Sequence, residues 1–367
     1  MAFNWNEVAS APQPDEIEVT VVGPGFGECV VVHAGQGEWL IVDSCRDPDT
    51  KKPVALAYFE ALGIDPGVAV AWVVATHWHE DHVAGIDDVV AACTAADFHC
   101  AAQLQDREFI RYIARSQAVA GADNAREFRN VFELLRNSNK QVRWTHGGRT
   151  LAVRTGSKMD CSFRLEALSP SDREFDLFLD RIGSRIALQG QPHRALVSSD
   201  PNFAAIALSL CWGDHSVLLG ADLLAHGQHD RGWLAAVSQA KILGAPKANF
   251  VKIPHHGSQS AHCAAMWAEL LMSRPLSVVT PYNRGPKLGR PPKRSDLKRI
   301  ADLSERTLLT APTQSGRARP QSSPISLGLA QHGIRMRTLR ARIGIARARS
   351  RPGMPWRTEL FGRAAQV

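Results

Sequence analysis

The sequence predicts an α/β protein folded as a four-layer αββα sandwich. Each half of the chain contains several β-branched runs of strand length, and stretches with helical spacing lie between these runs. The 367 residues, of which 44% are apolar and 22% charged, are sufficient for one large globular domain. Two strand-rich halves with intervening helices fit two packed sheets, each covered by helices on its outer face.

The first half opens with an antiparallel meander. Residues 17–22, 28–34 and 38–44 are three β-branched runs separated by glycine-containing turns. Helical spacing over 53–63, ending at a glycine, predicts a helix, and the apolar run 69–76 predicts a buried strand. A further helix is predicted over 85–95, and a mostly helical, charged insert over about 102–139.

The second half repeats this pattern. Strands are expected over 163–170 and within 204–222, where the pair Gly213-Asp214 marks a hairpin turn. A helix over 227–244, a strand over 249–254, a helix over 261–272 and a strand over 275–282 follow. We therefore expect one large folded domain over residues 1–310 and a separate C-terminal tail over 311–367.

The tail is set apart by its arginines. Residues 317–367 contain eleven arginines, no lysine and one acid, Glu359, so their net charge is +10 against +7 for the whole chain. This Ser-, Pro- and Arg-rich composition is typical of a disordered extension. The tail could bind nucleic acid electrostatically or have no specific role. The alternative, a basic groove on the body, would lie around Arg284, Lys287, Arg290, Lys293 and Arg294, and the negative balance of the body argues against it.

The segment THWHEDH, residues 76–82, carries the strongest chemical signal. It follows a buried strand and contains His77, His79, Asp81 and His82. Imidazole and carboxylate groups are the ligands of Zn²⁺ and also suit Mn²⁺ and Fe²⁺. Residues two apart on an extended segment point to the same side, whereas adjacent residues diverge, so one loop can supply parts of two metal sites.

The spacing H-x-H-x-D-H resembles the signature of the metallo-β-lactamase superfamily. LIVDS with Asp43, LLGAD with Asp222 and KIPHHGS at 252–258 resemble further motifs of the superfamily, in the expected order over about residues 17–284. VGPGFGECVVVH, NFAAIALSL, the doubled histidine and TPYN are closest to the hydrolase domain of ComEC, the DNA-uptake channel protein.

The resemblance implies two divalent metal ions. It gives His77 and His79 to the first ion, Asp81, His82 and His255 to the second, and Asp222 as the bridge. Asp43 would orient a histidine of the first motif. The spacing does not decide whether His255 or His256 is the ligand, and the resemblance favours His255; His256 would then support a ligand or face the substrate, as a second catalytic residue beside Asp81. A further ligand of the first ion has no clear match; the candidates are His146, His193, Asp200 and Asn202.

The function expected from this resemblance is metal-dependent hydrolysis by a metal-activated hydroxide. A phosphodiester or related phosphoester is the expected substrate, because paired metals suit in-line displacement at phosphorus. A thioester or lactone hydrolase, or a metal-stabilised interaction module without turnover, are the alternatives. The absence of a signal peptide and of a long apolar run predicts a cytoplasmic protein without a membrane partner. The oligomeric state is not indicated.

Overall fold

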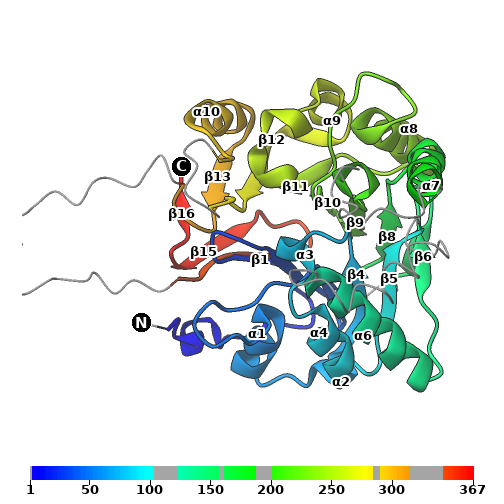
Figure 1. Cartoon of the computed structure of the whole chain (residues 1–367). Coiled ribbons are helices and arrows are strands. Elements are labelled where there is room, and N and C mark those ends of the chain that lie inside the picture. Colours follow the sequence, from blue (N-terminus) through cyan, green and yellow to red (C-terminus); the bar gives the residue numbers. More distant parts are fainter. Residues whose placement is uncertain (1, 103–122, 157–160, 187–200, 284–289, 314–341) are drawn as a thin grey trace, which may run out of the picture.

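The computed structural model in Figure 1 describes residues 2–102, 123–156, 161–186, 201–283, 290–313 and 342–367. Within these ranges the chain forms two eight-stranded sheets with helices on their outer faces. This arrangement confirms the predicted αββα sandwich. The helical insert expected over about 102–139 is represented by α6 (Asp123–Asn137), while 103–122 lie outside the described residues.

The first sheet carries the predicted N-terminal meander. Strands β1, β2 and β3 are antiparallel neighbours, and β4 and β5 then add in parallel to β3. In spatial order the sheet contains β15 (Arg357–Gly362), β14 (Gly344–Ser350), β1 (Ile17–Gly23), β2 (Cys29–Ala34), β3 (Trp39–Val42), β4 (Val70–Ala75), β5 (Asp97–Ala101) and β6 (Arg143–Thr145).

The second sheet contains the predicted hairpin. Strands β9 and β10 are joined at Gly213-Asp214, and β10 to β13 are successive parallel strands. In spatial order the sheet contains β16 (Ala365–Gln366), β13 (Arg306–Leu309), β12 (Leu271–Val279), β11 (Ala248–Lys252), β10 (His215–Leu219), β9 (Leu208–Trp212), β8 (Phe163–Ala167) and β7 (Thr150–Arg154). Strands β5, β6, β7, β13 and the three C-terminal strands β14 to β16 were not expected from the sequence.

Helices cover both outer faces of the sandwich (Figure 1). The side of the first sheet carries α1 (Val54–Leu62), α2 (Pro66–Ala69), α4 (Ile86–Ala92) and α6, and the side of the second carries α7 (Asp172–Ile186), α8 (Gly232–Leu243), α9 (Ala264–Glu269) and α10 (Arg294–Leu303). Helix α1 ends where predicted, because Gly63 adopts the left-handed conformation that a C-cap favours.

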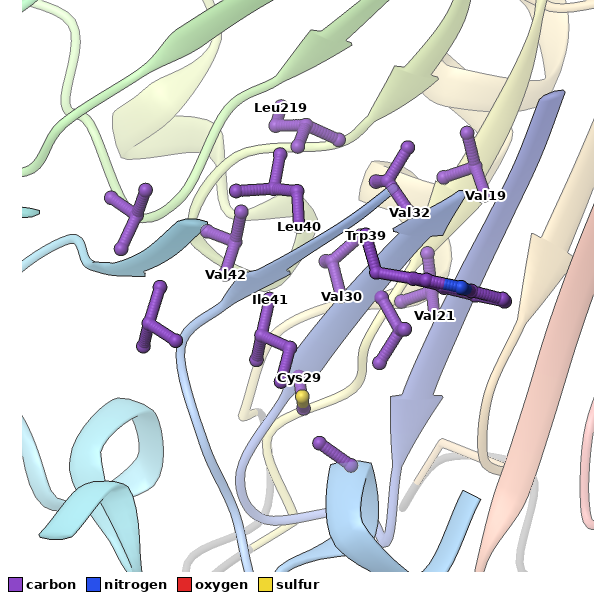
Figure 2. Close-up of a cluster of buried hydrophobic side chains, with 14 of the residues drawn as sticks. Val19, Val21, Cys29, Val30, Val32, Trp39, Leu40, Ile41, Val42 and Leu219 are labelled. Atoms are coloured by element: carbon purple, nitrogen blue, oxygen red, sulfur yellow. The ribbon is translucent and has the colours of Figure 1, made fainter. Parts of the chain in front are cut away.

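The main core lies at the first sheet and between the two sheets. Figure 2 shows Val19, Val32 and Leu40 of the first sheet on the same side as Leu219 of the second. Each fully buried side chain of this size stabilises the fold by about 1.5–3 kcal/mol. A second cluster, which includes Trp233 and Met266, fills the space between the second sheet and its helices.

The C-terminal region corrects the predicted domain boundary. Strand β14 pairs along its whole length with β1, from Ile17↔Ser350 to Gly23↔Gly344, and β16 pairs with β13. Residues 344–367 are therefore integral to both sheets, whereas 314–341 lie outside the described residues. The prediction of a separate tail was wrong because the alternating Ala-Arg pattern of β14 resembles a solvated segment.

The arginines of β14 are buried in ion pairs. Arg347 Nε lies 2.9 Å from Glu359, and Arg349 Nε lies 2.6 Å from Glu18. Arg347 also donates to the carbonyl oxygen of Val8 at 3.0 Å. These two arginines therefore hold the N-terminal segment on the first sheet and are not exposed for nucleic-acid binding.

Candidate metal centre

Strand ends at one edge of the sandwich bring the candidate residues together. His77 and His79 directly follow β4, and Asp81 and His82 lie in the short helix α3 (Glu80–Val83). Asp222 follows β10, and the doubled histidine follows β11. Because β10 and β11 are parallel, their carboxyl ends meet at the same edge of the second sheet.

Four overlapping groups of potential ligand atoms share this edge, and two of them together contain most of the predicted ligands. In the first group, one atom each from His77, His79 and Asp222 lie within 4.8 Å of one another. In the second, atoms of Asp81, His82 and His256 satisfy the same limit. Asp222 also contacts the second group, because its Oδ1 lies 3.5 Å from His82 Nε2 and its Oδ2 lies 3.4 Å from His256 Nε2.

The buried histidines turn their Nε2 atoms toward the centre. His256 Nδ1 is 2.9 Å from the carbonyl oxygen of Thr280, which can only accept, so Nδ1 carries the hydrogen. His82 Nδ1 is 2.7 Å from Asp43 Oδ2 and likewise donates. In both rings the Nε2 lone pair is left for a ligand, which is the usual arrangement of metal-binding histidines.

His77 is oriented through a relay that starts at the same carboxylate. Thr76 Oγ1 donates to Asp43 Oδ2 at 2.8 Å and can therefore accept from His77 Nδ1, which lies 2.9 Å away. Asp43 Oδ1 accepts from the backbone N–H of Thr76 at 2.7 Å. Asp43 thus fixes two histidine rings, as the sequence predicted for one.

The structure favours His256 over His255 at the centre, which corrects the sequence-based choice of ligand. His256 Nε2 lies 3.2 Å from Asp81 Oδ2, whereas His255 Nε2 lies 3.3 Å from the amide nitrogen of Asn202. Within the described residues, His255 belongs to none of the clusters compact enough to hold an ion. Both histidines have positive φ, 46° and 54°, and their ring centroids are 6.0 Å apart.

Unusual backbone conformations concentrate at this edge. Asp43 and Ala221 have φ values of 60° and 44°, in addition to the two histidines of the 255–257 turn. Positive φ is uncommon for residues other than glycine and costs on the order of 1–3 kcal/mol each. The surrounding fold therefore maintains strain at the residues that aim side chains into the centre, as is frequent at functional sites.

A buried ion pair next to the centre, Glu28 with Lys252, was not predicted from the sequence. Glu28 and Lys252 are only 2% and 1% exposed, and Lys252 Nζ contacts Glu28 Oε1. Lys252 Nζ also donates to the carbonyl oxygen of Ala221 at 3.1 Å, and Thr280 Oγ1 donates to Glu28 Oε2. The sequence did contain an indication of this pair, because Glu28 and Lys252 each adjoin an apolar strand run. A charge buried in such a place requires a partner.

The glycine-rich loop 23–27 packs against the metal motif. The backbone N–H of Glu28 donates to the carbonyl oxygen of Asp81 at 2.9 Å. Gly27 has φ +99°, and a Cβ there would lie 2.6 Å from the Cβ of Cys45. Only glycine therefore fits this close approach.

The electrostatics of the centre favour bound cations. Burial disfavours the imidazolium of His82, yet nearby carboxylates, Asp222 foremost, raise its pKa well above the usual range. Burial opposes the charge of His256 as well, and Asp222 and Asp81 raise its pKa to about 10. Burial would raise the pKa of Asp81, but His82 and His256 lower it to about 2.

The donor set fits a divalent metal ion. Asp81 Oδ2, His82 Nε2 and Asp222 Oδ1 are buried atoms without a hydrogen-bond partner among the described residues. Leaving such atoms unpaired costs about 1–3 kcal/mol each, and coordination would satisfy all three. Imidazole nitrogen and carboxylate oxygen together suit Zn²⁺, Mn²⁺ and Fe²⁺.

The remaining candidates for a further ligand differ in position. His146 is exposed, with Nδ1 donating to the carbonyl oxygen of Gly147 at 2.8 Å, and belongs to none of the clusters formed by described residues. Asn202, in the short 3₁₀ helix Pro201–Ala204, contacts His255 instead. His193 and Asp200 lie outside the described residues.

Two packed mixed sheets with a His/Asp centre at one edge define a protein of metallo-β-lactamase fold. In agreement, residues 22–154 match the family model described as the metallo-beta-lactamase superfamily. The matched range contains the THWHEDH motif and ends before Asp222 and His256.

Similar solved structures are distant in sequence. The metallo-beta-lactamase fold protein YhfI from Bacillus subtilis has 12% identity and a TM-score of 0.40, over 80% of this chain and 95% of its own. MEM-A1, a subclass B3 metallo-beta-lactamase from a soil metagenome library, has 11% identity and a TM-score of 0.33, over 70% and 83%. A CmlA beta-hydroxylase variant has 15% identity and a TM-score of 0.38, over 93% and 55%.

A comparison with curated proteins gave no significant match. Within the described ranges, no helix combines the length and the apolar character needed to cross a bilayer.

Proposed function

We propose that this protein is a metal-dependent hydrolase of phosphodiester bonds, related in its motifs to the ComEC-type hydrolase domain. The observation that carries the proposal is the buried set of unpaired donor atoms on Asp81, His82 and Asp222. Superfamily members are mostly metal-dependent hydrolases, so a preserved donor set supports turnover over a purely structural role.

The proposed ligands divide between two ions that share one carboxylate. Four histidines, His77, His79, His82 and His256, belong to the two groups, and Asp222 contacts both groups. We assign His77, His79 and Asp222 to one ion, and Asp81, His82, His256 and the same Asp222 to the other. Zinc is the best match to this mixture of ligands, and manganese or iron would share it.

The ions would polarise the attacked bond and lower the pKa of a bound water, so that a nucleophile forms near neutral pH. The protein's own residues orient this chemistry. Asp81, buried beside His82 and His256, can accept a hydrogen bond from the attacking water. Asp43 and Thr280 hold the imidazoles of His82 and His256, so the rings need not reorganise during the reaction.

The charge around the centre favours an anionic substrate. Glu28 also lies near His82 and His256, but its ion pair with Lys252 adds no net charge, so the carboxylates that count are those of Asp43, Asp81 and Asp222. Two divalent ions would carry one more positive charge than these three carboxylates. A phosphodiester anion gains from this balance, whereas a neutral thioester or lactone does not.

The experiment is turnover of bis(p-nitrophenyl) phosphate by the full chain, loaded with Zn²⁺ or Mn²⁺ or treated with EDTA. We expect metal-dependent release of p-nitrophenol, lost in Asp222→Asn and retained in Asp302→Asn, a control on the exposed face of α10. Hydrolysis of thioesters or lactones, with no phosphodiester turnover, would overturn the substrate class. Full metal loading without turnover of any of these substrates would identify a metal-stabilised interaction module instead.

A further inference from the structure

The segment that follows β12 places an aromatic ring directly beside the proposed metal ligand His256. The ring centroids of Tyr282 and His256 are 5.2 Å apart. Tyr282 is only half-buried, and Phe26 of the glycine-rich loop meets it edge to face at 5.3 Å. The backbone N–H of Tyr282 donates to the carbonyl oxygen of Pro291 at 2.9 Å, which ties the two ends of this segment together.

Arg290 lies over the same ring. Its guanidinium carbon is 5.2 Å from the Tyr282 centroid, a distance at which a cation is attracted by the aromatic face. The Tyr282 centroid is 5.2 Å from the guanidinium carbon and 5.2 Å from the His256 centroid. The guanidinium therefore lies at most about 10 Å from the His256 ring. The aromatic contact thus holds a positive charge at a fixed position next to the centre.

This cation has no anionic partner among the described residues. Its guanidinium lies over the ring of Tyr282, and its Nε is buried without a hydrogen-bond partner. The side chain as a whole remains partly exposed. A guanidinium presents donors in a planar fork that matches phosphate oxygens, so an unpaired one beside a hydrolytic centre fits an anion of the substrate.

The surroundings of Arg290 extend the positive charge. Lys293 and Arg294 are exposed at the start of α10. This region packs on the turn that carries His256, because Arg299 Nη2 donates to the carbonyl oxygen of Gly257 at 2.9 Å. The segment 290–294 therefore forms a basic rim beside the metal centre.

The buried arginines of β14 do not offer a comparable site. Arg347 and Arg349 are buried in ion pairs with Glu359 and Glu18. Arg351 lies 3.4 Å from Asp15. Of the residues considered for a basic groove on the body, Arg290, Lys293 and Arg294 lie in this rim, whereas Arg284 and Lys287 lie outside the described residues.

We propose that Arg290, held by Tyr282, binds a second phosphate group of the substrate while the scissile phosphodiester lies at the metal centre. The inference rests on the proposed phosphodiesterase function and specifies its substrate class: a phosphodiester that carries another phosphate one linkage away. The ring of Tyr282 fixes the guanidinium, and the guanidinium donates to the phosphate oxygens. Lys293 and Arg294 add attraction at longer range.

The test compares two chromogenic substrates that differ only in the second phosphate. These are the p-nitrophenyl ester of thymidine 5′-monophosphate and the same ester with a 3′-phosphate. The zinc-loaded full chain should show a higher kcat/KM for the 3′-phosphorylated substrate. In Arg290→Ala this advantage should fall by about tenfold or more, the size of a lost charge-assisted hydrogen bond, with the other substrate changing less than about twofold.

Two further variants separate the geometry from net charge. Arg290→Lys keeps the charge but not the planar fork and should retain part of the advantage. Lys241→Ala removes an exposed charge on α8 and should retain all of it. An advantage that survives in Arg290→Ala, or that is equally reduced in Lys241→Ala, would overturn the proposal.

A binding measurement keeps this test independent of turnover. Calorimetry should show that the zinc-loaded protein binds thymidine 3′,5′-bisphosphate more tightly than thymidine 5′-monophosphate, and that Arg290→Ala abolishes the difference. If neither ester is hydrolysed but this binding pattern holds, the proposed hydrolysis fails and the phosphate subsite stands. Equal binding of the two nucleotides by the unsubstituted protein would overturn the subsite, whatever the turnover.

Discussion

Replacing Asp43 with Asn should weaken metal binding, although residue 43 is not itself a proposed ligand. The effect would act through His82 and His77, the two histidines that Asp43 orients. The amide oxygen of Asn must take the place of Oδ1, because that position accepts from the backbone N–H of Thr76 at 2.7 Å. The NH₂ group then occupies the position of Oδ2 and faces His82 Nδ1, 2.7 Å away. Two donors would meet there unless His82 moves its hydrogen to Nε2, the atom proposed to bind metal.

The same change propagates to His77. Thr76 Oγ1 can no longer donate to position 43 and can donate to His77 Nδ1 instead, which moves the hydrogen of that ring to Nε2 as well. Loss of one orienting partner typically costs 10–100-fold in metal affinity, about 1.4–2.7 kcal/mol. Because two rings are affected, we expect metal affinity to fall by about 100-fold.

The fold should tolerate this substitution. Asp43 has φ 60°, a conformation in which Asn is among the favoured residues, and the two side chains have nearly the same volume. Zinc affinity would be measured by competition with a chromophoric chelator, alongside the melting temperature of the metal-free protein, with Asp302→Asn as the control. Unchanged zinc affinity in a folded Asp43→Asn protein would refute the proposed orientation of the histidines.

Three further predictions follow from the structure. His256→Ala should lose one of two bound zinc ions, measured by elemental analysis after gel filtration, whereas His255→Ala should keep both; the reverse result would restore the sequence-based choice. Burial, then Asp87, raises the pKa of Glu127 from 4.5 to about 7, so the native state binds more protons than the unfolded state between these values and loses stability as pH rises. Glu127→Gln should therefore gain stability relative to the unsubstituted protein between pH 5 and pH 8.5, by at most about 3 kcal/mol in chemical denaturation, and a pH-independent difference would contradict this. Truncation after residue 341 removes β14 to β16 and should abolish cooperative unfolding, which a normal melting curve would disprove.

Much of the centre could be predicted because most of its residues lie in short sequence motifs at the ends of strands. THWHEDH places its histidines and Asp81 within one loop, and a strand precedes Asp222 and the doubled histidine. Parallel neighbouring strands bring such ends to one edge, so spacing and strand order suffice to predict where these residues meet. The sandwich followed from the same strand pattern.

The remaining features depend on contacts between distant residues. The choice between His255 and His256 rests on which ring lies near Asp81 and which lies near Asn202, and the letters HHG do not indicate these contacts. Glu28 and Lys252 become interpretable only when their strands are placed on opposite sides of the centre. The arginines of β14 looked solvated because their partners, Glu18 and the carbonyl group of Val8, lie more than 300 positions earlier in the chain.

The central claim is that two ions bind at this edge and share Asp222. Anomalous diffraction from crystals of the zinc-loaded protein, with data on both sides of the zinc absorption edge, tests it most directly. The account predicts two peaks on either side of the Asp222 carboxylate, one toward His77 and His79 and one toward His82 and His256. Absence of both peaks from this edge, or a peak coordinated by His255 in place of His256, would contradict it.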